Sequence, residues 1–322
     1  MAFEFPSLDS LLNKPAPSAG LKRVGITGAG GLIGKRLTTV LTAQGVTVTP
    51  IATNYKSGDY SPVDPASMEG LDVVIHLAGE NVASGEGPLG FLGRWSDAKK
   101  SKIMESRVEG TAALVAAMAG LKKKPKALVT ASGLGYYGYT DPAMVFDETS
   151  GRGSGFLADV CERWEAETVR ASAMGVKTAV IRFGVVLSPL GGAVAKLFPL
   201  FFLGVGGVLG SGQQPFSFVT LNDAVRAVLF VAEKRGALAG PINVCSPSPC
   251  SNADFTAAFG AALGRPTVFP LPQAVGSVVF GQMGDEMLFN GQRAVPSKLT
   301  RAGFKFQDVE INAAMKSCLQ DN

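Results

Sequence analysis

Residues 22–34 read KRVGITGAGGLIG, a short β-branched run that passes directly into a glycine-rich turn. The next stretch, KRLTTVLTAQG at 35–45, repeats its leucines and valine at helical spacing. A second β-rich run, VTVTPIAT, follows at 46–53. The three segments therefore predict a strand, a tight turn, a helix and a parallel strand, which is a βαβ unit of about 30 residues.

Three glycines of the turn, Gly28, Gly31 and Gly34, follow a GxxGxxG spacing. The first permits a sharp turn, the second lets backbone approach a diphosphate, and the third lets the helix pack closely on the strand. Because free N–H groups at a helix N-terminus attract phosphates, the turn predicts a dinucleotide site. A purely structural turn is the alternative, since the chain has 40 glycines. The predicted contacts are Gly28, Ala29, Gly31, Leu32, Ile33 and Gly34.

The end of the second strand indicates which dinucleotide is bound. An NAD site usually places Asp or Glu there, about 20 residues after the first glycine, to hold the ribose hydroxyls. This chain reads TNYK at 53–56, and its first carboxylate is Asp59. Neutral Asn54 and cationic Lys56, next to Thr53, are compatible with a 2′-phosphate, so NADP(H) is the predicted cofactor. A solvated loop charge is the alternative for Lys56.

Strands and helices alternate along the first two thirds of the chain. The expected strands are 71–79, 126–133 and 176–187, and the expected helices are 97–119 and 156–173. This alternation predicts an α/β fold with a doubly wound, mostly parallel sheet. The predicted units are an N-terminal tail at 1–20, an NADP(H)-binding Rossmann domain at 21–187, and a smaller C-terminal substrate or cap lobe at 188–322 with elements that return to the Rossmann domain.

Composition excludes several classes of function. The net charge of +4 is spread along the chain, which argues against nucleic acid as a ligand. Four cysteines without CxxC pairing predict reduced thiols in a reducing compartment. A single histidine excludes zinc sites built from several imidazoles, and no metal site is predicted. The longest apolar stretch, 197–209, is interrupted by proline and glycine, so a soluble protein without a transmembrane segment is expected.

Longer motifs resemble one family. They are TGAGGLIG (27–34), HLAGEN (76–81), RW (94–95), SRVEGT (106–111), ASGLGYYG (131–138), FLADVCERWE (156–165), IRFGVVL (181–187), LGVGGVLGSGQQPFSFV (203–219) and GQRAVPSKLTRAGF (291–304). From about Val24 to its C-terminus the chain resembles the atypical epimerase-like branch of the extended short-chain dehydrogenase/reductases, the YfcH-type proteins that are called SulA-like in plants. The last two motifs lie outside the nucleotide fold, which makes the set specific.

The resemblance implies a Rossmann sheet of seven strands or a similar number, with NADP(H) bound and the second lobe closing a cleft over the nicotinamide. It places Arg107 near the cofactor, and Phe183 and Gly184 near the nicotinamide end. The backbone on the adenosine and ribose side would be that of His76, Leu77, Ala78 and Gly79. A plain buried strand end is the alternative for these four residues. The implied compartment is the cytoplasm or the plastid stroma.

The acid/base pair of this superfamily is missing. Its members use Tyr-x-x-x-Lys on a helix, where the ammonium lowers the tyrosine pKa. None of the five tyrosines has a lysine four residues later. Aligned on FLADVCERWE, the family pattern places Leu157 in the tyrosine slot and Cys161 in the lysine slot. The usual proton-transfer machinery is therefore expected to be absent.

Three candidates for catalysis remain, Ser132, Tyr136 and Tyr137. In related extended members a serine or threonine at this strand end hydrogen-bonds the substrate carbonyl. A neighbouring tyrosine could donate a proton if Lys99 or Lys102, on the preceding helix, lowered its pKa. Packing or cofactor contact is the alternative for both tyrosines.

Two functions therefore stay open. The first is an NADP(H)-dependent oxidoreductase or epimerase-like enzyme with a non-standard proton donor and an unknown substrate. The second is a non-catalytic NADPH-binding regulatory or assembly protein, plastid-associated as its plant relatives suggest. The phenylalanines and glycines of 198–218 suit a small apolar or mixed-polarity molecule or a protein partner equally well. The oligomeric state is not predicted.

Overall fold

A computed structural model of the chain describes residues 20–53, 63–84, 94–138 and 141–320, so the predictions for Asn54, Lys56 and the tail fall outside the described part. Its centre is a six-stranded parallel sheet. The strands run across the sheet in the order β10 (Gly240–Val244), β6 (Lys177–Phe183), β4 (Ala127–Gly133), β3 (Val73–His76), β1 (Arg23–Thr27) and β2 (Thr47–Ile51). The expected α/β class with a parallel, doubly wound sheet is confirmed.

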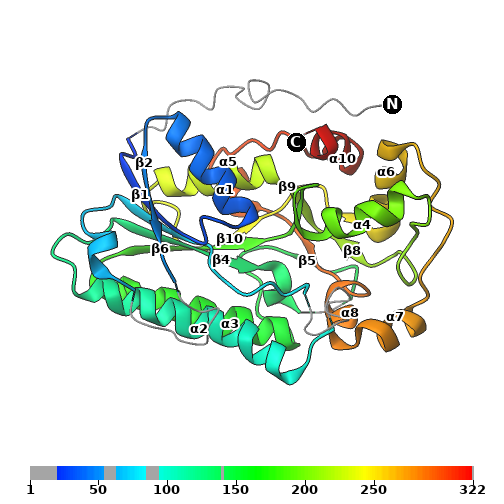
Figure 1. Ribbon diagram of the computed structural model, residues 1–322, viewed down its shortest axis with the longest axis horizontal. Helices are drawn as coiled ribbons and strands as arrows, with labels where there is room; N and C mark the ends of the chain where they lie inside the picture. Colours follow the sequence, from blue (N-terminus) through cyan, green and yellow to red (C-terminus); the bar gives the residue numbers. More distant parts are fainter. Residues whose placement is uncertain (1–19, 54–62, 85–93, 139–140, 321–322) are drawn as a thin grey trace.

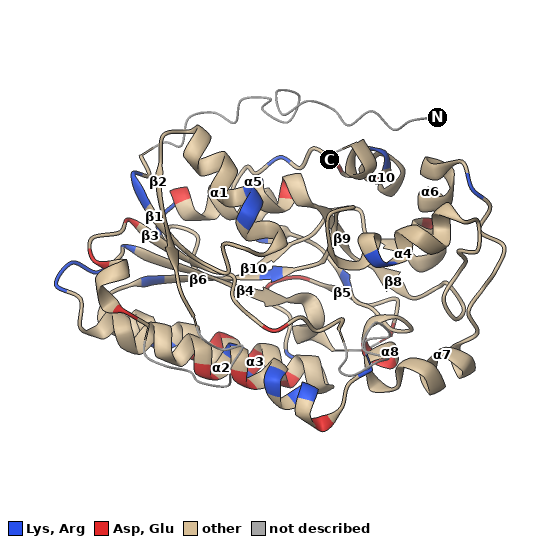
Figure 2. Cartoon of the chain, in the orientation of Figure 1, with Lys and Arg blue, Asp and Glu red and all other residues tan. Residues whose placement is uncertain are grey.

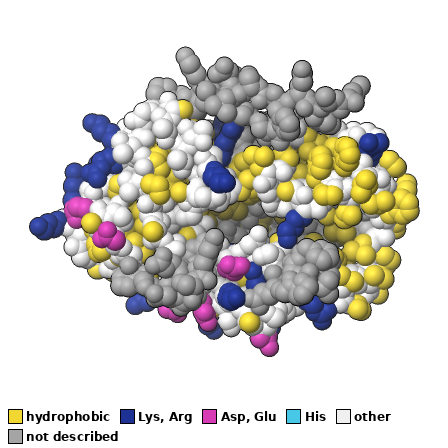
Figure 3. Space-filling model, in the orientation of Figure 1, with side chains coloured by type: hydrophobic (Ala, Val, Ile, Leu, Met, Phe, Trp, Pro, Cys, Tyr) yellow, Lys and Arg dark blue, Asp and Glu magenta, His cyan; other side chains and the backbone are white. Residues whose placement is uncertain are grey.

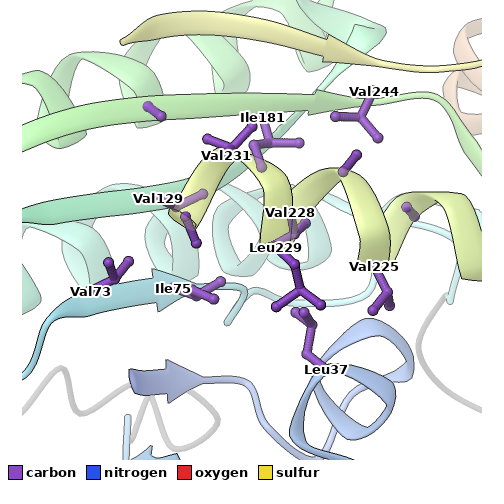
Figure 4. Packing of buried hydrophobic residues seen from close by; sticks show 14 of the residues in the cluster. Leu37, Val73, Ile75, Val129, Ile181, Val225, Val228, Leu229, Val231 and Val244 are labelled. Atoms are coloured by element: carbon purple, nitrogen blue, oxygen red, sulfur yellow. The ribbon is translucent and has the colours of Figure 1, made fainter. Parts of the chain in front are cut away.

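Helices cover both faces of this sheet (Figure 1). α1 (Leu32–Ala43) and α5 (Leu221–Glu233) lie on one face, and α2 (Asp97–Ala119) and α3 (Phe156–Arg170) lie on the other. Because side chains alternate along a strand, each strand contributes residues to the hydrophobic cores on both faces of the sheet. Ile75 packs with the first helix pair (Figure 4), whereas its neighbour Val74 packs toward the second.

The strand order reverses at β1, which lies between β2 and β3. Thr27, the last residue of β1, is in register with Ile51 on one side and with His76 on the other. All three strands therefore end at the same edge of the sheet. In open α/β sheets, ligands bind outside the carboxyl ends of the strands at such a switch point.

The expected strand 176–187 divides at Gly184. The N–H of Gly184 still donates to the Val244 carbonyl at 3.0 Å, but the next N–H, of Val185, donates to the Ser217 carbonyl at 2.9 Å. The chain thus leaves the main sheet and forms β7 (Val185–Leu187) beside β9 (Phe218–Thr220). A Cβ at Gly184 would lie 2.7 Å from the Ser217 oxygen, so only glycine permits this crossing.

Residues beyond 187 build a second core and also return to the first. β10 and α5 complete the main sheet and the helix layer over it. In the second core, Phe201 stacks on Phe259 with 4.3 Å between ring centres.

The other helices are α4 (Gly192–Phe202), α6 (Asn252–Leu263), α7 (Gln273–Phe280), α8 (Gln282–Met287), α9 (Ser297–Arg301) and α10 (Ile311–Gln320). The short strands are β5 (Val145–Phe146), β8 (Pro215–Phe216), β11 (Cys250–Ser251) and β12 (Arg293–Ala294). Within the described ranges, no helix is long and apolar enough to cross a membrane.

Candidate dinucleotide site

Two glycines of the turn after β1 are required by the packing of the chain itself. Gly28 has φ +67°, and a Cβ there would lie 2.9 Å from the backbone N of Ala78. A Cβ at Gly34 would lie 2.2 Å from the Gly28 carbonyl oxygen. These glycines therefore bring β1, the start of α1 and the loop after β3 into contact, as the motif predicts.

The other two glycines of the turn are less crowded than Gly28 and Gly34. A Cβ at Gly30 would meet no heavy atom within 4 Å, and one at Gly31 would meet only the Gly28 oxygen, at 3.2 Å. Gly31 is the N-cap of α1, which has no side-chain cap and no acidic residue in its first turn. The first-turn N–H groups lack partners within the helix and carry partial positive charge, so this end of α1 suits an anion.

A buried polar network joins the ends of β1 and β3. The Oγ1 of Thr27 accepts the N–H groups of Leu77 and Ala78 at 3.1 and 3.2 Å and lies 2.6 Å from His76 Nδ1. With both lone pairs in use, the Thr27 hydroxyl donates its proton to Nδ1, so Nε2 carries the imidazole proton and donates to Thr111 Oγ1 at 3.0 Å. The ring is fully buried, and this burial lowers the pKa of His76 to about 4. A neutral His76 therefore holds the loop in place from beneath, and its own side chain is not accessible to a ligand.

Arg107 lies against the same loop. Its guanidinium donates to the Glu80 carbonyl at 3.0 Å, stands 5.0 Å from the Trp164 ring centre, and would be 3.3 Å from a Cβ at Gly79. Beside it, the almost fully buried Lys99 forms an ion pair with Glu80 at 2.5 Å. The structure thus brings Arg107 together with the predicted His76–Gly79 segment, next to a Lys99–Glu80 ion pair that was not predicted.

A second buried network lies at the ends of β4 and β6. Ser132 Oγ donates to Glu165 Oε1 at 2.7 Å, and Arg182 binds the same carboxylate through Nε and Nη2 at 2.8 and 2.7 Å. Arg182 is 3% exposed. An ion-paired carboxylate only accepts hydrogen bonds, so the hydroxyl proton of Ser132 is directed at Glu165 and its oxygen is left as an acceptor.

The two tyrosines occupy different environments in the turn η4 (Leu134–Tyr137). Tyr137 is fully buried and donates toward the Asp147 carbonyl at 2.8 Å, and burial raises the pKa of its hydroxyl to about 12. Tyr136 is partly exposed, and the Arg182 guanidinium stands 3.4 Å from its ring centre. Lys99, one of the two lysines named as a possible cation for the tyrosines, pairs instead with Glu80, and the cation beside both tyrosine rings is Arg182.

Leu157 and Cys161, the residues in the slots of the missing catalytic pair, lie close to one turn of the chain. A Cβ at Gly135 would lie 3.0 Å from Leu157 Cβ, and one at Gly133 would lie 3.8 Å from Cys161 Sγ. Both side chains of α3 therefore face the turn that follows Ser132, and they are the two residues that the resemblance puts in the tyrosine and lysine slots. Burial raises the pKa of the Cys161 thiol, which keeps it protonated and unreactive.

The remaining predicted positions lie along the same edge of the sheet. Phe183 is the last residue of β6 and pairs in register with Gly133 of β4, and Gly184 follows it. Thr53 follows the end of β2, the edge strand next to β1.

Sequence reasoning missed Glu165 and Arg182, although an arginine inside the apolar run 179–187 already indicates a buried charge that needs a partner. Across the residues that the structure describes, no cluster of three or more His, Cys, Asp or Glu is placed to hold a metal ion.

Comparison with known proteins gives two family matches. The model of the NAD dependent epimerase/dehydratase family matches residues 24–245. A domain of unknown function matches residues 271–318, in the second lobe.

Relatives match along nearly the whole chain. The epimerase family protein Mb2239 of Mycobacterium bovis is 41% identical, over 91% of this chain and 96% of its own. A chloroplastic homologue of the epimerase family protein SDR39U1 from Arabidopsis thaliana is 31% identical, over 92% of this chain and 86% of its own. The crystal structure of human SDR39U1 with NADPH superposes with a TM-score of 0.81 at 33% identity, covering 92% of this chain and 98% of that one.

Proposed function

Because the chain belongs to the NAD-dependent epimerase/dehydratase family, we propose that it is an NADP(H)-binding oxidoreductase or epimerase-like enzyme of the YfcH-type, SulA-like branch. One observation carries the proposal: the uncapped N-terminus of α1, with Gly30 and Gly31 open to approach, at the switch point of a parallel sheet. The human relative with an NADPH-bound crystal structure supports the choice of cofactor.

We assign each part of this cofactor to residues of the chain. The backbone at 28–34 would bind the diphosphate, and the backbone at 76–79, with Arg107 beside it, would line the ribose side. Thr53, with Asn54 and Lys56 from the sequence, would meet the 2′-phosphate. Phe183 and Gly184 would lie at the nicotinamide end, next to Ser132. The cofactor, when bound, supplies or accepts a hydride.

The network at Ser132 suggests which substrate group is held there. Because Ser132 directs its proton at Glu165, its oxygen can accept a hydrogen bond from a substrate hydroxyl but cannot donate one to a carbonyl. Arg182 fixes the carboxylate by two bonds, which keeps that direction constant. Tyr136 is the better candidate for exchanging a proton with the substrate, since Tyr137 is fully buried and its hydroxyl is occupied.

A second function is favoured by one specific observation. The slots of the missing pair hold Leu157 and Cys161, both packed on the turn after Ser132. An apolar residue there provides no proton and no ammonium. A non-catalytic protein whose assembly or regulation responds to NADPH, in the cytoplasm or in a plastid stroma as the chloroplastic relative suggests, would need neither.

The test is to purify the chain, identify any nucleotide that copurifies, titrate NADPH and NADH, and then assay hydride transfer over a panel of carbonyl and alcohol substrates. The enzyme proposal predicts that NADPH binds more tightly than NADH and that at least one substrate turns over. Ser132→Ala should then lower kcat by about 10²-fold and leave the Kd for NADPH unchanged. Tight NADPH binding without turnover would favour the non-catalytic function. Absence of binding to both nucleotides would contradict each of them.

A further inference from the structure

Lys196, on α4 of the second lobe, contacts the first lobe. Its Nζ donates a hydrogen bond to the carbonyl of Ala83, in the loop that follows β3. This loop continues from the segment 76–79, which is assigned to the ribose side of the cofactor. Lys196 is an exposed residue, so packing does not fix its ammonium in this position.

The start of α4 lies against the start of α1, where the diphosphate is proposed to bind. A Cβ at Gly191, the residue before α4, would lie 3.4 Å from Cδ1 of Leu32. Leu32 is the first residue of α1 and follows the glycine turn directly. α4 therefore touches both segments assigned to the nucleotide, the start of α1 through Gly191 and the loop after β3 through Lys196.

The charge of Lys196 is not neutralised by any carboxylate that the structure describes. Its described partner is a neutral carbonyl, and Glu80, the acidic residue of the same loop, is paired with the almost fully buried Lys99. Partial desolvation, and then the positive charge of Lys99, lower the pKa of Lys196. An anion beside Lys196 would relieve this repulsion, and an ammonium gains more from a phosphate oxygen than from a neutral carbonyl.

The two helices that meet at Gly191 carry no acidic side chains. Neither α1 nor α4 contains Asp or Glu, whereas acidic side chains crowd on α2 and α3 (Figure 2). On the molecular surface, the visible acidic side chains lie at the left end and in the lower half of the view, away from α4 (Figure 3). An anion that approaches the start of α1 therefore meets a region in which basic side chains predominate.

We infer that Lys196 binds the diphosphate of the dinucleotide and so ties the second lobe to the cofactor. The ammonium exchanges the Ala83 carbonyl for a phosphate oxygen, which the flexible stem of a lysine allows. The N–H groups at the start of α1 carry only partial charges, so Lys196 supplies a full positive charge to the diphosphate. The inference rests on the proposed function, because it needs a dinucleotide at the start of α1.

The test compares Lys196→Met with the wild type in fluorescence titrations of NADPH and of NADH. Because both nucleotides contain the same diphosphate, the Kd of each should rise by the same factor, about tenfold. Lys196→Arg keeps the charge and should lose less affinity than Lys196→Met. Lys177→Met is the matched control and should leave both Kd values unchanged, since it removes an exposed lysine at the start of β6, on the opposite edge of the sheet.

Folding of Lys196→Met is checked by its melting temperature without nucleotide, which should equal that of the wild type because Lys196 is exposed. Hydrogen exchange of the wild type supplies a measurement without substitutions: NADPH should slow exchange of the amides at 192–196. Should the methionine variant melt lower, Lys196→Arg and the exchange data still decide.

Unchanged Kd values for Lys196→Met would overturn the inference, and so would amides at 192–196 that NADPH leaves unprotected. A loss of affinity confined to NADPH would also overturn it, because the ammonium would then lie at the 2′-phosphate. A wild type that binds neither nucleotide would overturn the proposed function together with this inference, whereas the first three results leave the proposed function intact.

Discussion

His76 shows at the scale of one residue how a buried network produces a measurable property of the whole protein. Its pKa of about 4 in the folded state lies below the 6.5 of the unfolded chain. The unfolded state therefore binds the extra proton first, and the contribution to stability is complete above pH 6.5 and is lost as pH falls toward 4. Between pH 7 and pH 5 the free energy of unfolding should fall by about 2 kcal/mol.

Urea unfolding at several pH values measures this slope. The chain has a single histidine, and burial raises the pKa of the Asp308 carboxyl, which changes stability in the opposite direction as pH falls. A fall in stability between pH 7 and pH 5 is therefore assigned to His76, and His76→Gln, which cannot titrate, should remove it. A wild type of constant stability over that range would contradict the account of the network.

A substitution at Gly31 should affect nucleotide binding and not folding. A Cβ at this position would lie 3.2 Å from the Gly28 oxygen, so Gly31→Ala needs a backbone shift of only a few tenths of an ångström and should still fold. The added methyl group would stand where the diphosphate approaches α1, and the Kd for NADPH should rise about tenfold or more. Gly110→Ala is the matched control, since it lies in α2 outside the turn and its Cβ would meet no heavy atom within 4 Å. Equal affinities of the two variants, measured by NADPH fluorescence titration, would refute this role.

A substitution at Gly34 should instead affect the stability of the fold. A Cβ only 2.2 Å from the Gly28 oxygen forces backbone to move, so Gly34→Ala should lower the free energy of unfolding by about 2–3 kcal/mol. Gly110→Ala, inside α2 with no heavy atom within 4 Å, should be neutral or stabilise by up to about 1 kcal/mol. Similar denaturant midpoints for both variants would show that the close approach at Gly34 is unimportant.

Sequence identified the residues whose role follows from local geometry and missed those whose role depends on distant partners. The glycines at 28, 31 and 34 are recognisable because strand, turn and helix are adjacent in the chain. The partners of Arg182 and Lys99 were not, because Glu165 and Glu80 lie on other elements and periodicity contains no information about which elements meet. For the same reason Arg182 was not considered beside Lys99 and Lys102 as a cation near the tyrosines.

At the scale of elements, the start of α3 depends on the second lobe. Glu286 of α8 accepts the N–H groups of Phe156 and Leu157 at 3.0 and 2.9 Å and so caps a helix of the sheet's outer layer. Removing the carboxylate leaves two N–H groups without this partner, and Glu286→Ala should cost about 1–2 kcal/mol. Glu286→Gln, which keeps one acceptor, should cost less. Thermal unfolding with no difference between Glu286→Ala and wild type would contradict this.

Boundaries of helices and strands were predicted where local turn residues mark them, and were missed where tertiary contacts determine them. The expected strand 71–79 is reduced to Val73–His76, and the expected helix 156–173 ends at Arg170 before a single 3₁₀ turn. The break in 176–187 could not be predicted, because Gly184 is needed only where Ser217, 33 residues later, crosses it. A continuous apolar run reads as one strand until its partners are known.

For the whole molecule, the sequence predicted the sheet and its layers, and the boundary near residue 187 stays a prediction. β10 and α5 lie beyond that boundary yet complete the sheet and the core over it. A fragment of residues 21–187 would expose that core, so it should show no cooperative unfolding transition by circular dichroism. A fragment that melts cooperatively would establish an independent first domain.

The central claim is that the backbone between Thr27 and Gly34 binds the diphosphate of NADP(H). Amide hydrogen exchange of the full chain, with and without saturating NADPH, tests it most directly. The amides at 28–35 and 77–79 should be protected by the nucleotide, while those of α10 should not change. NADPH that leaves the glycine turn unprotected, or protects only segments away from the ends of β1 and β3, would contradict the account.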